Sequence, residues 1–298
     1  MKTLNQTVKT YMENHARPLE RALYAYHFEG GALDCVLEEL KQFQNKDGGF
    51  GHGLEPDFFT PESSPIATWA AANIIRDLHI NAHPMIDHMI DYLLTCPHQS
   101  HGLFHTKIKE NNAYPHAPWW HYEANQINDY NPTASLLGFL CRYMNPDHLL
   151  YTSILERTQK AIDHFMDHDV TEMHELRCFV ELYHDIYLNK PRDAFTEKLA
   201  SLIIKTIESD HRLWFTSYCV KPSQLMINPQ TPGYIKIKAL VDLEHQLLLE
   251  NRHQDGLWSI TWDWSDHDPL AFEVAKKAWQ GIIALNHLMR FKTFHFEG

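Results

Sequence analysis

A short turn segment recurs four times along the chain, and this repeat limits the possible folds more than any other feature. Its clearest copies read Gln-Asn-Lys-Asp-Gly-Gly-Phe at 44–50 and Gln-Asp-Gly-Leu-Trp at 254–258. The copy at 99–104 keeps a glycine and a phenylalanine, and the degenerate copy at 210–214 has lost its glycine but keeps an aromatic residue. A motif that returns between helices is typical of architectures built from repeated helix pairs.

Each copy combines the residues that end one helix with those that start another. Glycine adopts the positive φ that commonly ends a helix, and the aromatic side chain can pack beneath the turn. A polar loop and a proline follow, and proline suits the first turn of a new helix. The residues just before that proline are therefore expected at a helix N-terminus.

Apolar residues elsewhere recur at spacings of three and four, as in Leu33, Val36, Leu37 and Leu40, which predicts amphipathic helices. The alternation typical of strands is nearly absent, and 214–220 is a short β candidate. We predict an all-α protein with one domain over 1–298, an α/α toroid in which helices within 1–30 pack on a ring of repeats at about 31–291. The expected helices are 5–14, 18–28, 31–44, 64–79, 84–95, 133–144, 148–167, 172–187, 193–208, 233–250 and 270–291.

Composition excludes several classes of partner. The 298 residues carry a formal net charge of -12 without a cluster of five basic residues, so nucleic acids and anionic membranes are not expected partners. The five cysteines are scattered, which predicts reduced thiols. The chain shows neither a signal peptide nor about 18 successive apolar residues. We therefore expect a cytoplasmic protein without stable membrane insertion, and the oligomeric state stays open.

The repeated turns resemble those of known toroid families. The segment at 44–51 resembles the repeat of protein prenyltransferase β subunits, and the segment at 254–258 resembles the QW motif of squalene-type terpenoid cyclases. Gly-Phe-Gly-His-Gly-Leu-Glu-Pro-Asp, Trp119-Trp120, Asn131-Pro132-Thr133-Ala134 and Trp279-Gln280-Gly281 look like a bacterial group of prenyltransferase-like proteins without an assigned reaction. The resemblance implies an α/α toroid over the repeats.

Departures from these families narrow the expected chemistry. The chain lacks the Asp-x-Cys pair with which prenyltransferases hold zinc, so we predict neither protein prenylation nor a metal site. Cyclases of the squalene type open an inner helix with Asp-x-Asp-Asp, whereas this chain has Asp266-His267-Asp268-Pro269. The resemblance implies that Asp268 stands at the proton-donor position, without the final aspartate of the motif.

In a toroid the loops before the inner helices meet at one mouth, and here these loops are acidic and aromatic. Carboxylates gathered in a partly dry space shift one another's pKa, which leaves a protonated acid beside an ionised one. Capping of helix N-termini is the alternative role for each of these acids. The candidate catalytic residues are Asp268, Asp266, Asp263, Asp57, Glu55 and Asp129. The candidate substrate-binding residues are Trp119, Trp120, Tyr130, Trp262, Trp264 and His52.

Three functions fit these residues. The first is a terpene-cyclase-like enzyme that protonates an isoprenoid and stabilises the cation on aromatic faces. The second is a carbohydrate-active hydrolase or lyase with a carboxylate pair and tryptophan platforms. The third is a toroid that binds a ligand without catalysis. We expect a small-molecule substrate, isoprenoid or sugar, and no cofactor. Only Lys46, Lys107 and Lys109 lie near these loops, so a diphosphate would require Mg²⁺ in place of a cationic clamp.

Overall fold

A computed structural model describes residues 2–187 and 193–296, and the regular secondary structure of these residues is almost entirely helical. The expected all-α class is confirmed. The helices are α1 (Lys2–Asn14), α2 (Pro18–Glu29), α3 (Leu33–Lys41), α4 (Pro65–Asp77), α5 (Pro84–Thr95), α6 (Thr133–Tyr143), α7 (Tyr151–Asp167), α8 (Met173–Ile186), α9 (Ala194–Thr206), α10 (Pro222–Leu225), α11 (Tyr234–Glu250) and α12 (Pro269–Thr293). Three 3₁₀ turns occupy Lys109–Ala113, Pro118–Trp120 and His211–Leu213.

Eleven of these helices lie where hydrophobic periodicity predicts them, and α10 is the addition. The β candidate at 214–220 is wrong, because this segment forms turns and irregular backbone. The strands in the described residues are β1 (Gln99–Ser100) and β2 (Leu103–Phe104), which pair antiparallel across the second copy of the turn motif.

The four turn motifs share one structural role. Their aromatic residues, Phe50, Phe104, Trp214 and Trp258, are all buried. One glycine of each glycine-bearing copy, Gly48, Gly102 or Gly256, has the positive φ that glycine adopts without strain. These glycines lie in the loops and do not end the helices, because α3, α5 and α11 already end at Lys41, Thr95 and Glu250. The expectation that the glycine ends the preceding helix is therefore wrong. The third copy carries Arg212 instead and winds into the 3₁₀ turn at 211–213.

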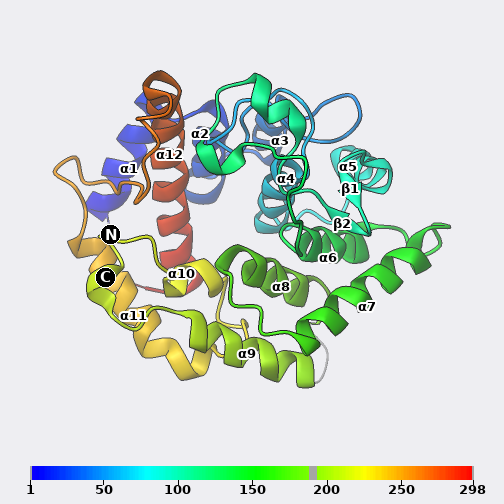
Figure 1. The fold of residues 1–298 in the computed structure, drawn as a ribbon. Helices are drawn as coiled ribbons and strands as arrows, with labels where there is room; N and C mark the ends of the chain where they lie inside the picture. The colour runs from blue at the N-terminus through cyan, green and yellow to red at the C-terminus, as the bar shows by residue number, and fades with distance from the viewer. Residues whose placement is uncertain (1, 188–192, 297–298) are drawn as a thin grey trace.

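Helix packing follows the chain and then returns to its start. Helix α4 contacts α6, α6 contacts α8, α8 contacts α10, and α10 contacts α11. The last helix, α12, packs against both α1 and α2, as the red and blue ribbons in Figure 1 show. The beginning and the end of the chain are therefore neighbours, which brings loops that are far apart in sequence close together.

A buried ion-pair network joins three of these helices. Arg76 on α4 donates to Asp185 of α8 at 2.6 Å and to the backbone oxygen of Ser135 on α6 at 2.8 Å. Glu181 of α8 accepts from the Trp69 indole at 2.7 Å and from Arg177 at 2.7 Å. Buried charges with this many partners fix the relative positions of the helices.

Among the described helices, none is long and apolar enough to cross a membrane.

Candidate functional site

The loop before α4 meets the loop before α12 at one carboxylate. Asp57 accepts hydrogen bonds from the indole nitrogens of Trp264, at 2.8 Å, and Trp262, at 3.0 Å, one on each carboxylate oxygen. Burial raises the pKa of Asp57, whereas the indole N–H groups of Trp264, Trp279 and Trp262 oppose that rise. The Trp279 indole nitrogen has no hydrogen-bond partner among the described residues, so it acts on Asp57 from a longer distance. The indoles therefore favour the charged carboxylate.

Glu55 lies two residues before Asp57 in the same loop and is also buried. Its carboxyl accepts from the Trp120 indole at 3.2 Å and from the backbone nitrogen of Asp57 at 3.3 Å. Burial, and then the charge of Asp57, raise the pKa of Glu55 to about 8. The indole donors on both oxygens make Asp57 the carboxyl of the pair that is suited to carry the charge, and Glu55 the one that keeps its proton near neutral pH.

The start of α2 holds this loop in place. Arg17 donates to the backbone oxygens of Gly53 at 2.8 Å and Leu54 at 3.3 Å. The same guanidinium forms a two-pronged ion pair with the buried Glu20, with distances of 2.6 and 2.8 Å. Because a two-pronged pair fixes the plane of the guanidinium, Arg17 fixes the backbone from which Glu55 projects.

A second group of acids gathers where the loop before α6 meets the start of α8. Glu175 accepts from the backbone nitrogen of Tyr130 at 3.1 Å, and burial raises the pKa of Glu175 to about 7. Asp129 accepts from the backbone nitrogen of Asn131 at 2.8 Å. The Tyr130 ring lies 4.7 Å from His164 and 5.7 Å from Phe179, centroid to centroid.

Beside this group runs a hydrogen-bonded chain of three side chains. Glu172 caps α8 and contacts His174 Nδ1 at 2.6 Å, and His174 Nε2 contacts the Tyr218 hydroxyl at 2.9 Å. With its Nδ1 proton directed at Glu172, His174 accepts the Tyr218 proton at Nε2. A carboxylate, an imidazole and a hydroxyl in series can pass a proton between them.

The hydrogen-bonded series of Glu172, His174 and Tyr218 lies within electrostatic range of the Glu55–Asp57 pair. Desolvation raises the pKa of Tyr218, and the charges of Glu172 and Asp57 raise it further. Tyr218 nonetheless keeps 58% of its surface exposed. Its hydroxyl therefore lies within electrostatic reach of both acidic groups while it stays open to solvent.

The three predicted acids at the start of α12 have simpler surroundings. Asp268 is the N-cap of α12 and accepts from the backbone nitrogen of Ala271 at 3.0 Å. Asp263 is exposed and accepts from the backbone and hydroxyl of Ser265 at 2.7 and 2.6 Å. Asp266 is exposed. The contacts of Asp268 and Asp263 are those of capping and turn formation.

The remaining predicted residues are divided between the site and the surface. Trp120 joins the site through Glu55 and packs edge-on against Phe58, with ring centroids 5.1 Å apart. Trp119 is 41% exposed. His52 is exposed, has a φ of 56° and contacts the Asn45 side-chain oxygen at 2.9 Å.

Sequence reasoning missed Arg17, Glu172, His174, Glu175 and Tyr218. The repeated turn does not precede α8, so the motif did not indicate that the start of α8 contributes residues to a site. The signal that could have found it is Glu172, an acid ahead of an apolar helical stretch that contains Leu176 and Phe179. Tyr218 follows the degenerate third turn.

Comparison of the chain with models of protein families, with curated proteins and with solved structures gives no match.

Proposed function

We propose that this protein is an acid–base enzyme in which protonated Glu55 and ionised Asp57 form the catalytic pair. The observation that carries the proposal is the contrast between the two buried carboxyls. Glu55 has a pKa of about 8, and Asp57 is held charged by indole N–H groups. Two neighbouring carboxyls in different protonation states are the arrangement that general acid catalysis uses.

The acidity of Glu55 favours one class of reaction. A carboxyl with a pKa of about 8 is close to the optimum for a general acid near neutral pH. Such an acid protonates a departing oxygen efficiently, as in glycoside cleavage, whereas an alkene requires a much stronger acid. We therefore infer a carbohydrate-type substrate and a hydrolase or lyase reaction.

The chain formed by Glu172, His174 and Tyr218 supports this reading as a second proton-transfer group. Tyr218 is exposed but feels the charge of Asp57, as expected for a side chain on the wall of a hollow. In a hydrolysis, Glu55 would give its proton to the leaving oxygen as the carbon–oxygen bond breaks and the oxygen of a water bonds to that carbon. The water would give a proton to the Tyr218 hydroxyl while Tyr218 gives its own proton to His174 Nε2. Partly exposed Trp262 would stack on the sugar face.

The same site supports the toroid as the finer architecture. Helix α12 packs on α1 and α2, and helices α4, α6, α8, α10 and α11 pack in that order. Loops before α4, α8 and α12 contribute Asp57, Glu172 and Trp262, and Tyr218 lies before α10. A ring with the starts of its inner helices at one mouth accounts for both observations.

A terpene-cyclase-like reaction is the second candidate, and the aromatic surroundings of Asp57 favour it. Trp262 and Trp279 meet edge to face with centroids 5.2 Å apart, and tryptophan faces stabilise cations. In this mechanism Asp57 and the indole rings would stabilise a carbocation, and Asp268 would be the proton donor, as the family resemblance implies.

The test incubates the full chain with a panel of oligosaccharides and with polyprenyl substrates, and follows the products by mass spectrometry. We expect turnover of a saccharide that falls at least about 100-fold in Glu55→Gln and in Asp57→Asn. Tyr218→Phe should lower kcat by about 10-fold or more without an equal change in KM. Exposed Asp263→Asn and Tyr114→Phe are the matched controls.

Saccharide turnover that is unchanged in the Glu55 and Asp57 variants would remove the pair from the mechanism. Polyprenyl turnover that depends on Asp268 rather than Glu55 would favour the cyclase-like reaction. Binding of a saccharide without turnover would identify a ligand-binding toroid.

A further inference from the structure

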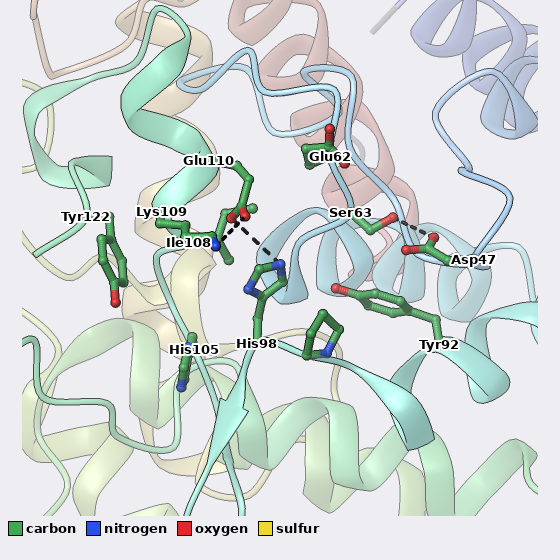
Figure 2. Close-up of a pocket in the computed structure, with 11 residues that line it drawn as sticks. Asp47, Glu62, Ser63, Tyr92, His98, His105, Ile108, Lys109, Glu110 and Tyr122 are labelled. Atoms are coloured by element: carbon green, nitrogen blue, oxygen red, sulfur yellow. Dashed lines mark hydrogen bonds and ion pairs between the residues drawn. The ribbon is translucent and has the colours of Figure 1, made fainter. Parts of the chain in front are cut away.

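A pocket of about 590 Å³ lies apart from the candidate site, between the first turn motif, α5 and the segment that follows β2 (Figure 2). Its wall includes Asp47 of the turn motif, Tyr92 of α5, and His98 and Glu110 from the segments that flank the hairpin. None of the proposed catalytic groups belongs to this wall. The volume suits a small molecule.

One buried hydroxyl in this wall lacks a partner. Tyr92 is 2% exposed, and its hydroxyl makes no hydrogen bond within the described residues. Burial, and then the nearby Cys96 thiol, raise the pKa of Tyr92, but the thiol does not meet hydrogen-bond geometry. Figure 2 shows the Tyr92 oxygen directed into the pocket. Since a buried polar group without a partner is costly, this hydroxyl indicates an occupant.

A carboxylate oxygen on the opposite side is also unsatisfied. Glu110 Oε2 is buried, has no hydrogen-bond partner in the described part of the chain and lies 3.9 Å from His98 Nε2. Burial lowers the pKa of His98, which disfavours a charged ring beside Glu110. Lys109 Nζ lies 3.8 Å from the other oxygen, Oε1, on an exposed side chain, which leaves Oε2 unpaired on the pocket side. Asp47, Tyr92 and Glu110 line the same pocket, and the charges of the two acids add to the burial that raises the pKa of Tyr92.

The charge of the wall determines the class of occupant. Asp47, Glu62 and Glu110 are acidic, whereas the one lysine of the wall, Lys109, has a side chain that is 76% exposed. The Asp47 carboxylate uses Oδ1 for the Ser63 hydroxyl and the Gly49 nitrogen, at 2.7 and 3.0 Å. This negative wall repels anions and favours a cation. The described residues contain no group of side chains suited to a metal ion, which leaves an organic cation.

We propose that this pocket binds a small organic ammonium compound, whose N–H groups donate to Glu110 Oε2 and to the Tyr92 hydroxyl oxygen. An ammonium group has three donors and no acceptor, which matches two converging acceptors. The Tyr92 proton is then free to turn toward the Cys96 thiol. This inference is independent of the reaction proposed at Glu55 and Asp57.

Isothermal titration of the full chain at low salt tests the pocket with three four-carbon probes: putrescine, 1,4-butanediol and succinate. We expect putrescine alone to bind. Glu110→Gln should weaken its binding by about 10-fold or more, because a charged hydrogen bond is lost. Tyr92→Phe should weaken it by about 3- to 10-fold, as expected for one neutral acceptor.

Matched controls separate the pocket from general effects. Tyr143→Phe removes another buried tyrosine hydroxyl that has no hydrogen-bond partner within residues 2–187 and 193–296, and Glu250→Gln removes an exposed acid. Neither residue lines the pocket. Thermal unfolding of each variant reports on folding, and if Tyr92→Phe fails to fold, Glu110→Gln decides the test. The proposal is overturned if putrescine does not bind, if the diol or the diacid binds as tightly, or if Glu110→Gln leaves the affinity unchanged.

Discussion

The indole nitrogen of Trp264 donates a 2.8 Å hydrogen bond to Asp57, across 207 residues of sequence. This contact ties the loop that follows the first turn motif to the loop that follows the last. Because both partners are buried, the bond holds the two ends of the repeat series together at the candidate site.

Asp57→Asn should destabilise the protein as well as inactivate it. An amide in place of the carboxylate turns an NH₂ group toward one of the two indole donors and leaves that donor unpaired. The expected loss is about 1–3 kcal/mol in the free energy of unfolding, measured by urea denaturation. Asp263→Asn, at an exposed position of the α12 loop, should change it by less than about 1 kcal/mol. Equal effects of the two substitutions would contradict the assigned role of the indole bonds.

Glu55→Gln should make the protein more stable in mild alkali. The pKa of Glu55 is about 8 in the folded state against an ordinary value of 4.5. Its contribution to stability is therefore present below pH 4.5 and is lost as the pH rises to about 8. The free energy of unfolding of the variant minus that of the natural protein should rise by up to about 4 kcal/mol between pH 4.5 and pH 8.5. Urea denaturation across this range measures the gain, and parallel pH profiles of the two proteins would show that Glu55 titrates normally.

His245→Phe should reduce sensitivity to acid. His245 is fully buried among Phe291, Phe294 and Phe296, and neither ring nitrogen has a partner in the described residues. Burial lowers its pKa from 6.5 to about 3, so the unfolded chain gains a proton first and stability falls as the pH drops from 6.5 toward 3.

Phenylalanine removes this proton uptake. The fall in unfolding free energy between pH 6 and 4 should become shallower by about 1.4 kcal/mol per pH unit. Denaturant titration at several pH values measures it, with exposed His253→Gln as the control. A slope that is unchanged in His245→Phe would assign the acid sensitivity to other groups.

Gly138→Ala should destabilise the protein, because it disrupts the packing of α6 against α8. A β-carbon at Gly138 would lie 2.9 Å from Asp185 Oδ2 and 2.9 Å from the Leu182 α-carbon. Asp185 is held by Arg76 at 2.6 Å, so it has no room to move aside. We expect a loss of about 1–3 kcal/mol in thermal or urea unfolding.

A glycine in α12 provides the comparison. At Gly281 the nearest atom to an added β-carbon is 3.4 Å away. Gly281→Ala should therefore be neutral or slightly stabilising, because alanine favours helix. A loss in Gly281→Ala as large as that in Gly138→Ala would mean that helix packing at Asp185 is not the cause.

Local patterns were enough to predict most of the helices and the positions of the turns. Apolar spacing located eleven helices, and the Asp-Gly pairs marked turns in which Gly48 and Gly256 have positive φ. These features depend on residues within one helical turn of each other. The α10 helix was not predicted, because its four residues are too few to show the hydrophobic periodicity of a helix.

The candidate site was predicted less completely, since its members come from separate loops. Acid and indole content pointed to Glu55, Asp57, Trp262 and Trp264, and the structure brings these four together. The same reasoning gave equal weight to Asp268, which instead caps its own helix. Sequence cannot distinguish these roles, because a capping aspartate and a paired aspartate share the same local pattern.

The sequence by itself determined the helical class, the order of the helices and the turns between them, since these follow from propensities and contacts between near neighbours. The tertiary structure alone decided which acids are buried together. It also brought Tyr218 to His174, and the Tyr92 hydroxyl and Glu110 to one pocket. Burial and long-range pairing set protonation states, and both depend on residues that only the folded chain brings into contact.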